Sequence, residues 1–374
     1  MVRCTLWCCL LSLGLLIVRV SAAEEVIPAP PSNPNVALLL RLQGTDLSAN
    51  PNLRTLLNRT LEATVGTPDF VELVRAFKLT DRDTDLMSTA LANSAESAGV
   101  DAIRLLLGRT NVEVIRRTLA GPDAEKAIQL LGNVGEKSVN ELITPIILDA
   151  KRALPVRETA VEAVVKSREG AAWLVKQAEE RTLAAELRPA ATRALAEVRW
   201  PEIVEAAAKV LPPEPVKGSS PLPPTEELIV REGDPVAGER VFFGSAAACS
   251  RCHQVRGKGT DFGPNLSEIG GKYGKDGIYA AILTPSAGIG FGFEAWQVDF
   301  KNGDDAFGLI VSETADEIAM KAVSGIVSRF KKETIARRTQ QSTSIMPEGL
   351  GQAIGADALV NLVEFLATLR KQEE

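Results

Sequence analysis

The sequence predicts a mainly helical protein, with two helical domains and a small antiparallel sheet inserted in the second. Small and aliphatic residues recur at helical spacing over about 37–211, together with a weak internal repeat. The proline-rich stretch 212–224 is too stiff and polar for a core element, so we expect it to be a linker to residues 225–374. Within the second region, residues of about 294–338 alternate as strands do.

The first 22 residues are typical of a signal peptide. Arg3 precedes a largely apolar run from Leu6 to Val18, and Val20-Ser21-Ala22 supplies small residues for cleavage. Residues 23–36 are short, acidic and proline-bearing, which predicts a poorly ordered lead-in. We therefore expect the mature protein to be exported to the periplasm.

Length and charge limit the class of protein further. A chain of 374 residues, 45% hydrophobic and 24% charged, can bury two cores. Its formal net charge of −6 argues against nucleic acid as a partner. After the leader, no apolar run approaches the roughly 20 residues that span a bilayer, so we expect no membrane span in the mature chain.

Residues 37–211 are expected to form stacked helix pairs. Residues 122–128 align with 155–161 at a separation of 33, and residues 170–174 align with 201–205 at a separation of 31. This region resembles HEAT-like repeats, which implies an α-solenoid of four or five pairs. The resemblance leaves two roles open: an extended surface for a protein partner, or rigid support for the second domain.

The chemistry of the second region is carried by the pentapeptide Cys249-Ser250-Arg251-Cys252-His253. This is the spacing by which haem is attached covalently in c-type cytochromes. Two thiols three positions apart can add to the two vinyl groups of one porphyrin, and the imidazole that follows lies under the iron. We therefore predict that Cys249 and Cys252 hold one haem c and that His253 is its proximal iron ligand.

Two other roles of this cysteine pair are less favoured. Exported proteins commonly commit paired cysteines to disulfides. A redox-active pair, however, would normally open a helix after a strand, whereas the residues before Cys249 are predicted to be helical. A structural zinc ion needs four ligands, and the mature chain offers two cysteines and the single histidine His253.

The helices of the second region resemble those of class I cytochromes c. Asp234-Pro235 supplies a capping residue and a first-turn proline for a helix that ends near Gly244, and the closing helix runs from about Asp357 to Arg370. In class I cytochromes c the first and last helices cross. A crossing of this kind is predicted for Gly238 and Phe242 against Phe365 and Leu366, with Gly238 allowing close approach of the backbones.

The same resemblance implies two further site residues. Met346 lies in a loop just before the closing helix and is followed by proline, as the distal ligand is in class I cytochromes c, so we predict that it is the distal iron ligand. Met87 is expected in the helical core, and Met320 falls in a strand-like pattern. The resemblance also implies that the carbonyl of Pro264 accepts the proton on the second imidazole nitrogen of His253.

Four alternating segments predict the antiparallel insert, with turns at 302–303 and 324–325: Trp296–Phe300, Phe307–Val311, Ile318–Ala322 and Ile326–Phe330. The insert could shield a haem edge or dock a partner. Basic residues outnumber acidic ones from 251 to 275, namely Arg251, Arg256, Lys258, Lys272 and Lys275 against Asp261 and Glu268. Such local positive charge can steer an acidic redox partner, although a solvated charged face is the commoner explanation.

Residues 225–374 as a whole resemble the haem-binding domain of large secreted proteins from Planctomycetes and Verrucomicrobia. The motifs that carry this resemblance are 249–253, 263–264, 294–296 and 344–350. In those proteins the domain often stands beside HEAT-like repeats and a dehydrogenase-like propeller. The present chain has no room for a propeller, so we expect any dehydrogenase to be a separate protein.

These observations favour a periplasmic carrier of single electrons, whose helical repeats dock a redox protein such as a periplasmic dehydrogenase. No catalytic residue is assigned. Two alternatives stay open. A haem enzyme that binds or reduces a small ligand such as peroxide would need an open sixth position on the iron, against which Met346 and the lack of a second histidine argue. A redox sensor would instead act through the contacts of the solenoid.

Overall fold

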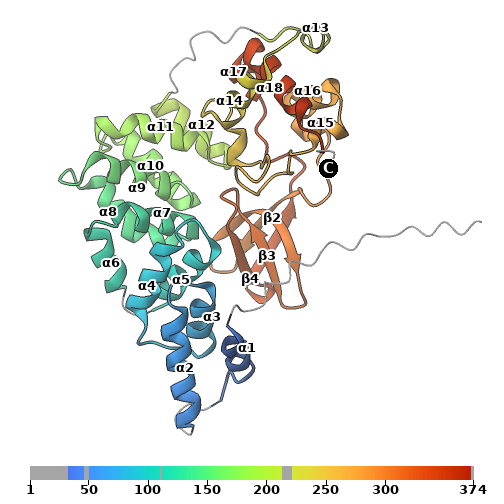
Figure 1. Ribbon diagram of the computed structural model, residues 1–374. Helices are drawn as coiled ribbons and strands as arrows, with labels where there is room; N and C mark the ends of the chain where they lie inside the picture. Colours follow the sequence, from blue (N-terminus) through green and yellow to red (C-terminus); the bar gives the residue numbers. More distant parts are fainter. Residues whose placement is uncertain (1–32, 46–49, 110–111, 213–220, 372–374) are drawn as a thin grey trace, which may run out of the picture.

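The computed structural model describes residues 33–45, 50–109, 112–212 and 221–371. The predicted signal peptide and most of the predicted lead-in and linker lie outside these residues. The described part is mainly helical and contains one small antiparallel sheet, as the sequence predicts (Figure 1). No helix in these ranges combines the length and the apolar character needed to cross a membrane.

The N-terminal domain, called the helical domain below, consists of helices arranged in two stacked rows, on the left of Figure 1. The helices are α1 (Pro34–Arg41), α2 (Pro51–Thr64), α3 (Pro68–Ala76), α4 (Asp83–Ala92), α5 (Ser97–Leu107), α6 (Glu113–Ala120), α7 (Ala124–Val134), α8 (Asn140–Leu148), α9 (Leu154–Val164), α10 (Arg168–Glu179), α11 (Arg188–Ala196) and α12 (Pro201–Val210), with 3-10 turns η1 (Lys137–Val139) and η2 (Ala185–Leu187). In one row α3, α5, α7, α9 and α11 each contact the next helix of the row, and in the other row α10 contacts α12.

The segments that align in the sequence fall on neighbouring helices of these rows. Residues 155–161 lie in α9 and residues 122–128 at the start of α7, and the two helices meet where Gly132 packs on Ala163. A Cβ atom on Gly132 would lie 2.8 Å from the Cβ of Ala163, so a larger residue would push the helices apart. The assignment to HEAT-like repeats stays a prediction.

The C-terminal domain is built around the crossing of a helix near its start with its last helix. It contains α13 (Thr225–Ile229), α14 (Pro235–Phe243), η3 (Cys249–Arg251), α15 (Ile269–Lys272), α16 (Lys275–Leu283), η4 (Pro285–Ala287), α17 (Leu350–Ile354) and α18 (Ala356–Thr368). The carboxylate of Asp234 caps α14 by accepting from the Val236 amide at 2.8 Å. As predicted, α14 crosses α18: a Cβ on Gly238 would lie 1.9 Å from the Asn361 carbonyl oxygen, and the ring centroids of Phe242 and Phe365 are 5.8 Å apart.

Five strands form the insert: β1 (Ala295–Phe300), β2 (Asp305–Glu313), β3 (Glu317–Lys321), β4 (Val327–Lys331) and β5 (Ile335–Gln340). All pair antiparallel in the order β4-β3-β2-β1-β5. The prediction of four strands, the last ending at Phe330, was wrong, because the structure adds β5 and the sheet extends to Gln340, slightly beyond the predicted insert of about 294–338. Residues 336–340 are exposed at the edge of the sheet, so β5 lacks the apolar alternation that marks a half-buried strand.

Candidate haem-attachment site

A short turn after α14 holds the two cysteines. Ala248 adopts a left-handed conformation with φ of 50° and donates its amide to the Gly244 carbonyl at 3.0 Å. The amides of Cys252 and His253 then donate to the Cys249 carbonyl at 3.1 and 2.9 Å. Cys249 and Cys252 therefore project from one 3-10 turn, as free and partly buried thiols, and His253 follows directly.

The segment after the cysteines folds back on them and forms, with them, what we call the attachment loop (residues 249–263). The Thr260 amide donates to the Ser250 carbonyl at 2.9 Å, and the Gly263 amide donates to the Cys252 carbonyl at 2.7 Å. These bonds are all between backbone groups, and the side chain of Gln254 adds a further bond within the loop by donating to the Gly259 carbonyl at 3.4 Å.

The imidazole of His253 is oriented by a backbone carbonyl. Its Nδ1 lies 2.8 Å from the carbonyl oxygen of Pro264. Because a carbonyl oxygen can only accept, Nδ1 must carry the proton, and the lone pair of a neutral ring is then on Nε2. Burial lowers the pKa of His253, and the contact with Pro264 opposes this in part. The neutral ring is the form that binds a metal ion.

Gly263 is the residue that lets the loop lie across this ring. A Cβ atom at Gly263 would lie 2.7 Å from Cε1 and 2.9 Å from Nδ1 of His253. Such contacts are shorter than van der Waals distances, so any side chain here would force the ring or the loop to move.

Gly263→Ala is therefore expected to tilt the imidazole and weaken its bond to Pro264. We expect a partly high-spin absorption spectrum and a raised midpoint potential, since a ring that loses this hydrogen bond is a weaker electron donor. Gly288→Ala is the matched control, because no atom lies within 4 Å of a Cβ at Gly288. If the two variants gave the same spectrum and potential as the unmodified protein, the orienting role of this contact would be disproved.

The thiols do not resemble those of a redox-active pair. Burial raises the pKa of Cys249 to about 11, against the opposing effect of a backbone hydrogen bond, and burial also raises the pKa of Cys252. Cysteines that exchange disulfides instead have lowered pKa values, because their thiolates are stabilised. Across the described ranges, no group of three or more His, Cys, Asp and Glu side chains could hold a metal ion by itself.

Met346 lies in a loop that is fastened to η4. The Met346 amide donates to Oγ of Ser344 at 3.1 Å, and the Ser344 amide donates to Oγ of Ser286 at 3.2 Å. The side chain of Met346 is partly buried against the hydrophobic cluster of α14, α16 and α18, and Cys249 packs against the same cluster. Met320, in contrast, is buried in the core of the sheet, and Met87 is buried in the helical domain as expected.

These residues fit a covalently attached haem. The thiols share one turn, the ring of His253 has Nε2 available for the iron, and the glycine beside it leaves room for that orientation. Residues 236–306 match the family model of cytochrome c. This part of the chain is similar to a cytochrome c domain.

The match supports a domain of the class I c-type, with covalently bound haem c and a haem-binding, electron-transfer role. It includes the attachment loop and Pro264, whereas Met346 and α18 lie beyond its end. No curated protein matches the sequence significantly.

Two residues that shape the site were not singled out from the sequence. Ser286 holds the Met346 loop from 58 positions away, and nothing in a serine between a proline and an alanine indicates that role. Gly263 was named with Pro264, but its contact with the His253 ring was not foreseen. The signal that could have revealed this contact is the position of Gly263 directly before Pro264, whose carbonyl is predicted to bind His253.

Proposed function

We propose that the protein is a periplasmic c-type cytochrome that carries single electrons through one covalent haem, held by Cys249 and Cys252 and ligated by His253 and Met346. The observation that carries this proposal is the 2.8 Å contact of His253 Nδ1 with the Pro264 carbonyl, within a Cys-x-x-Cys-His motif. It supports the role of His253, because it fixes the ring in one orientation and leaves the lone pair of Nε2 available for the iron.

Met346 is the sulphur ligand best placed to complete the iron coordination. Among the methionines that the structure describes, Met87 and Met320 are buried in other cores. Of these three methionines, Met346 packs against the same hydrophobic cluster as Cys249, and two serine hydroxyls hold its loop. A bound haem c supplies a one-electron couple, and a thioether ligand favours the reduced iron. The loop of Met346 would also exclude small ligands from the sixth position.

The helical domain is proposed to be a HEAT-like solenoid that docks a redox partner, such as a separate periplasmic dehydrogenase. The proposal of a periplasmic location rests on the charged, apolar and small-residue segments of 1–22. The likeness of residues 225–374 to the haem-binding domain of Planctomycetes and Verrucomicrobia supports a partner of the dehydrogenase class.

The test is the absorption spectrum of the reduced holoprotein, matured with the cytochrome c machinery and recorded before and after carbon monoxide. We expect a low-spin spectrum that the gas does not change, together with a reversible one-electron titration. A shift on adding the gas would mean an open sixth position. The ligand-binding enzyme or the sensor would then replace the electron carrier.

A further inference from the structure

The attachment loop lies between the sheet and the helical domain. On one side, Lys321 of β3 pairs with Asp261 at 2.8 Å, and a Cβ on Gly325 would lie 3.1 Å from Cγ2 of Thr260. On the other side, Arg251 pairs with Glu197 of the helical domain at 3.9 Å. We call the place where Arg251 and Glu197 meet the seam.

The sheet is itself packed on the helical domain. Ile326 is buried in the hydrophobic cluster of the helical domain, and the Val327 amide donates to Oγ of Ser97 in α5 at 2.9 Å. The guanidinium of Arg104, also in α5, lies 5.2 Å from the ring centroid of Phe330. Strand β4 is therefore covered by α5 and is not a free edge.

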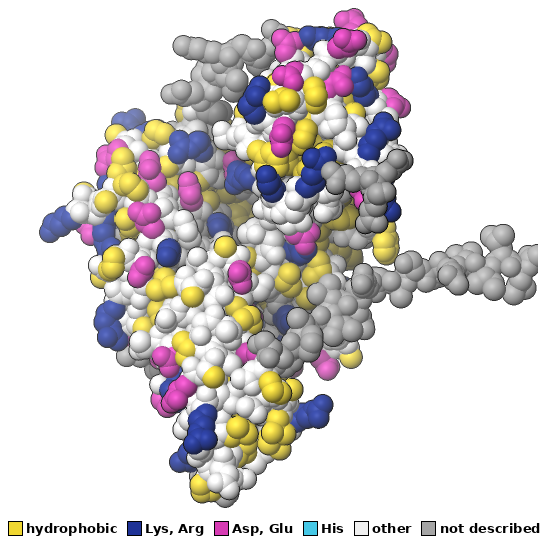
Figure 2. All heavy atoms as spheres, viewed as in Figure 1, with side chains coloured by type: hydrophobic (Ala, Val, Ile, Leu, Met, Phe, Trp, Pro, Cys, Tyr) yellow, Lys and Arg dark blue, Asp and Glu magenta, His cyan; other side chains and the backbone are white. Residues whose placement is uncertain are grey.

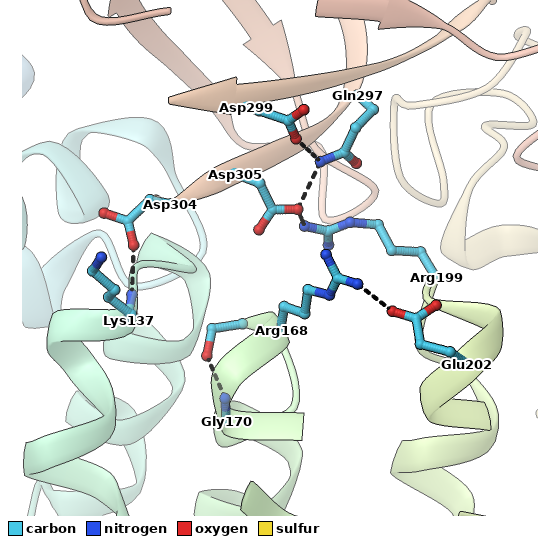
Figure 3. Close-up of polar contacts among 10 residues, drawn as sticks. Lys137, Arg168, Gly170, Arg199, Glu202, Gln297, Asp299, Asp304 and Asp305 are labelled. Carbon is cyan, nitrogen blue, oxygen red and sulfur yellow. Dashed lines mark hydrogen bonds and ion pairs between the residues drawn. The ribbon is translucent and has the colours of Figure 1, made fainter. Parts of the chain in front are cut away.

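A second contact fixes the sheet close to the seam. Arg199 pairs with Asp305 of β2, and Gln297 donates to the same carboxylate at 2.8 Å (Figure 3). The guanidinium of Arg199 also lies between two aromatic rings, 4.1 Å from the centroid of Trp200 and 5.6 Å from that of Phe307. This stacking holds Arg199 in place for the ion pair.

The basic residues on this side of the helical domain recur with the period of the repeat. Arg104, Lys137, Arg168 and Arg199 are spaced by 33, 31 and 31 residues. The Lys137 amide donates to the Asp304 carboxylate at 3.0 Å and its ammonium donates to the Asn302 carbonyl, whereas Arg168 pairs with Glu202 of α12 at 2.6 Å (Figure 3). Arg104, Lys137 and Arg199 therefore contact the sheet or the turn between β1 and β2, which fixes the orientation of the C-terminal domain.

The helical domain contributes a cation near the seam, because Lys166 stands 31 residues before Glu197, after the neighbouring helix α9, which contacts α11. Lys166 follows α9, is exposed to solvent and donates to Oδ1 of Asn133 at 2.7 Å. Desolvation by the surrounding protein lowers the pKa of Lys166, Glu162 raises it and the charge of Arg251 lowers it. Lys166 therefore adds an exposed positive charge to the helical-domain side of the seam, one helix away from the ion pair of Arg251 with Glu197.

The rest of the attachment loop adds positive charge. Val255 and Lys258 pair across a tight turn with Arg256 at its tip, and both basic side chains are exposed without an ion pair in the described part. Asp261 is neutralised by Lys321. Figure 2 shows Lys and Arg side chains along the edge of the C-terminal domain that faces the sheet and the helical domain.

We propose that the redox partner is an acidic protein that docks across the seam, contacting Arg251, Arg256 and Lys258 of the attachment loop together with Lys166 of the helical domain. This rests on the proposed function as an electron carrier. The helical domain thereby contributes to recognition of the partner directly. The contact of Arg199 with Asp305 keeps Lys166 and the attachment loop in a fixed position relative to each other.

The test uses ferrous holoprotein and two oxidants of opposite charge, hexacyanoferrate(III) and tris(phenanthroline)cobalt(III). Lys166→Glu is expected to slow oxidation by the anion about threefold at low ionic strength and to speed oxidation by the cation, because electrostatic steering changes sign. Lys209→Glu, at the opposite end of α12 from Arg199, is the control with the same change in net charge.

Equal effects of Lys166→Glu and Lys209→Glu would overturn the proposal, since Lys166 would then act only through net charge. Failure of the unmodified protein to exchange electrons with either oxidant would instead contradict the proposed function. The two results are therefore distinguishable.

The role of the sheet is tested by repeating the Lys166→Glu comparison in an Asp305→Asn background. Removing this carboxylate loosens the contact with Arg199, so the effect of Lys166→Glu should largely disappear. Glu313→Gln, which removes ion pairs within the sheet to Lys332 and Arg338, should leave the effect intact. If the effect of Lys166→Glu persisted in Asp305→Asn, the contact of the sheet with Arg199 would not be what fixes Lys166 relative to the attachment loop.

Discussion

Met346→Ala is expected to lower the midpoint potential of the haem and to let the ferrous iron bind carbon monoxide. Loss of the thioether removes a ligand that favours reduced iron and leaves the sixth position to water or to added ligands. The loop itself should persist, because the hydroxyls of Ser344 and Ser286 bind backbone amides and not the methionine side chain. Potentiometric titration and spectra under carbon monoxide measure the two effects.

Met320→Leu is the matched control for this experiment. Met320 is buried together with Val298 and Ile318 in the core of the sheet, and leucine roughly conserves its volume, so the potential should not change. An unchanged potential and no binding of carbon monoxide in Met346→Ala would disprove the distal assignment. If Met320→Leu instead showed both effects, Met320 would be the ligand.

The features that the sequence predicted well are those whose signal is local. The start of α14 follows from Asp234-Pro235, and the haem motif is a fixed spacing of five residues. The helix crossing also followed, because Gly238 stands in an otherwise well-formed helix and so indicates close approach of another backbone. Four strands were predicted because apolar and polar residues alternate along each of the four segments.

The features that were missed depend on partners far away in the sequence. Strand β5 pairs with β1 through backbone groups, and its exposed side chains carry no pattern. The contacts of Arg199 with Asp305 and of Arg251 with Glu197 join residues 106 and 54 positions apart, which a single sequence does not pair. The repeat period of the basic residues was visible in the sequence, but its use by the sheet was not.

These contacts bear on the choice between a support and a docking surface for the helical domain. Residues of α5, η1 and the turn before α12 are covered by the sheet, so this side of the helical domain supports the C-terminal domain. Glu197 and Arg251, in contrast, keep about 70% of their side-chain surface exposed where the domains meet. The two roles are therefore compatible, because the support places an open surface of the helical domain beside the attachment loop.

Gly238→Ala is expected to destabilise the C-terminal domain by about 3 kcal/mol, the upper part of the usual range for overpacking. The added Cβ would lie 1.9 Å from the carbonyl oxygen of Asn361 and 2.7 Å from the Cβ of Phe365. Both are atoms at or next to the backbone of α18, so the clash cannot be relieved by rotating a side chain. The gain in helix propensity, about 1 kcal/mol, is too small to compensate.

The measurement is denaturant unfolding of the holoprotein followed by haem absorbance, with Gly271→Ala as the control. Gly271 is also helical, and no atom lies within 4 Å of a Cβ there, so its substitution should be neutral or slightly stabilising. Because α14 leads directly into the turn that carries Cys249, Cys252 and His253, separation of α14 from α18 should also shift this turn relative to the hydrophobic cluster of α16 and α18 and lower the yield of covalent haem. Equal stability of the two variants would mean that the helices do not cross at Gly238.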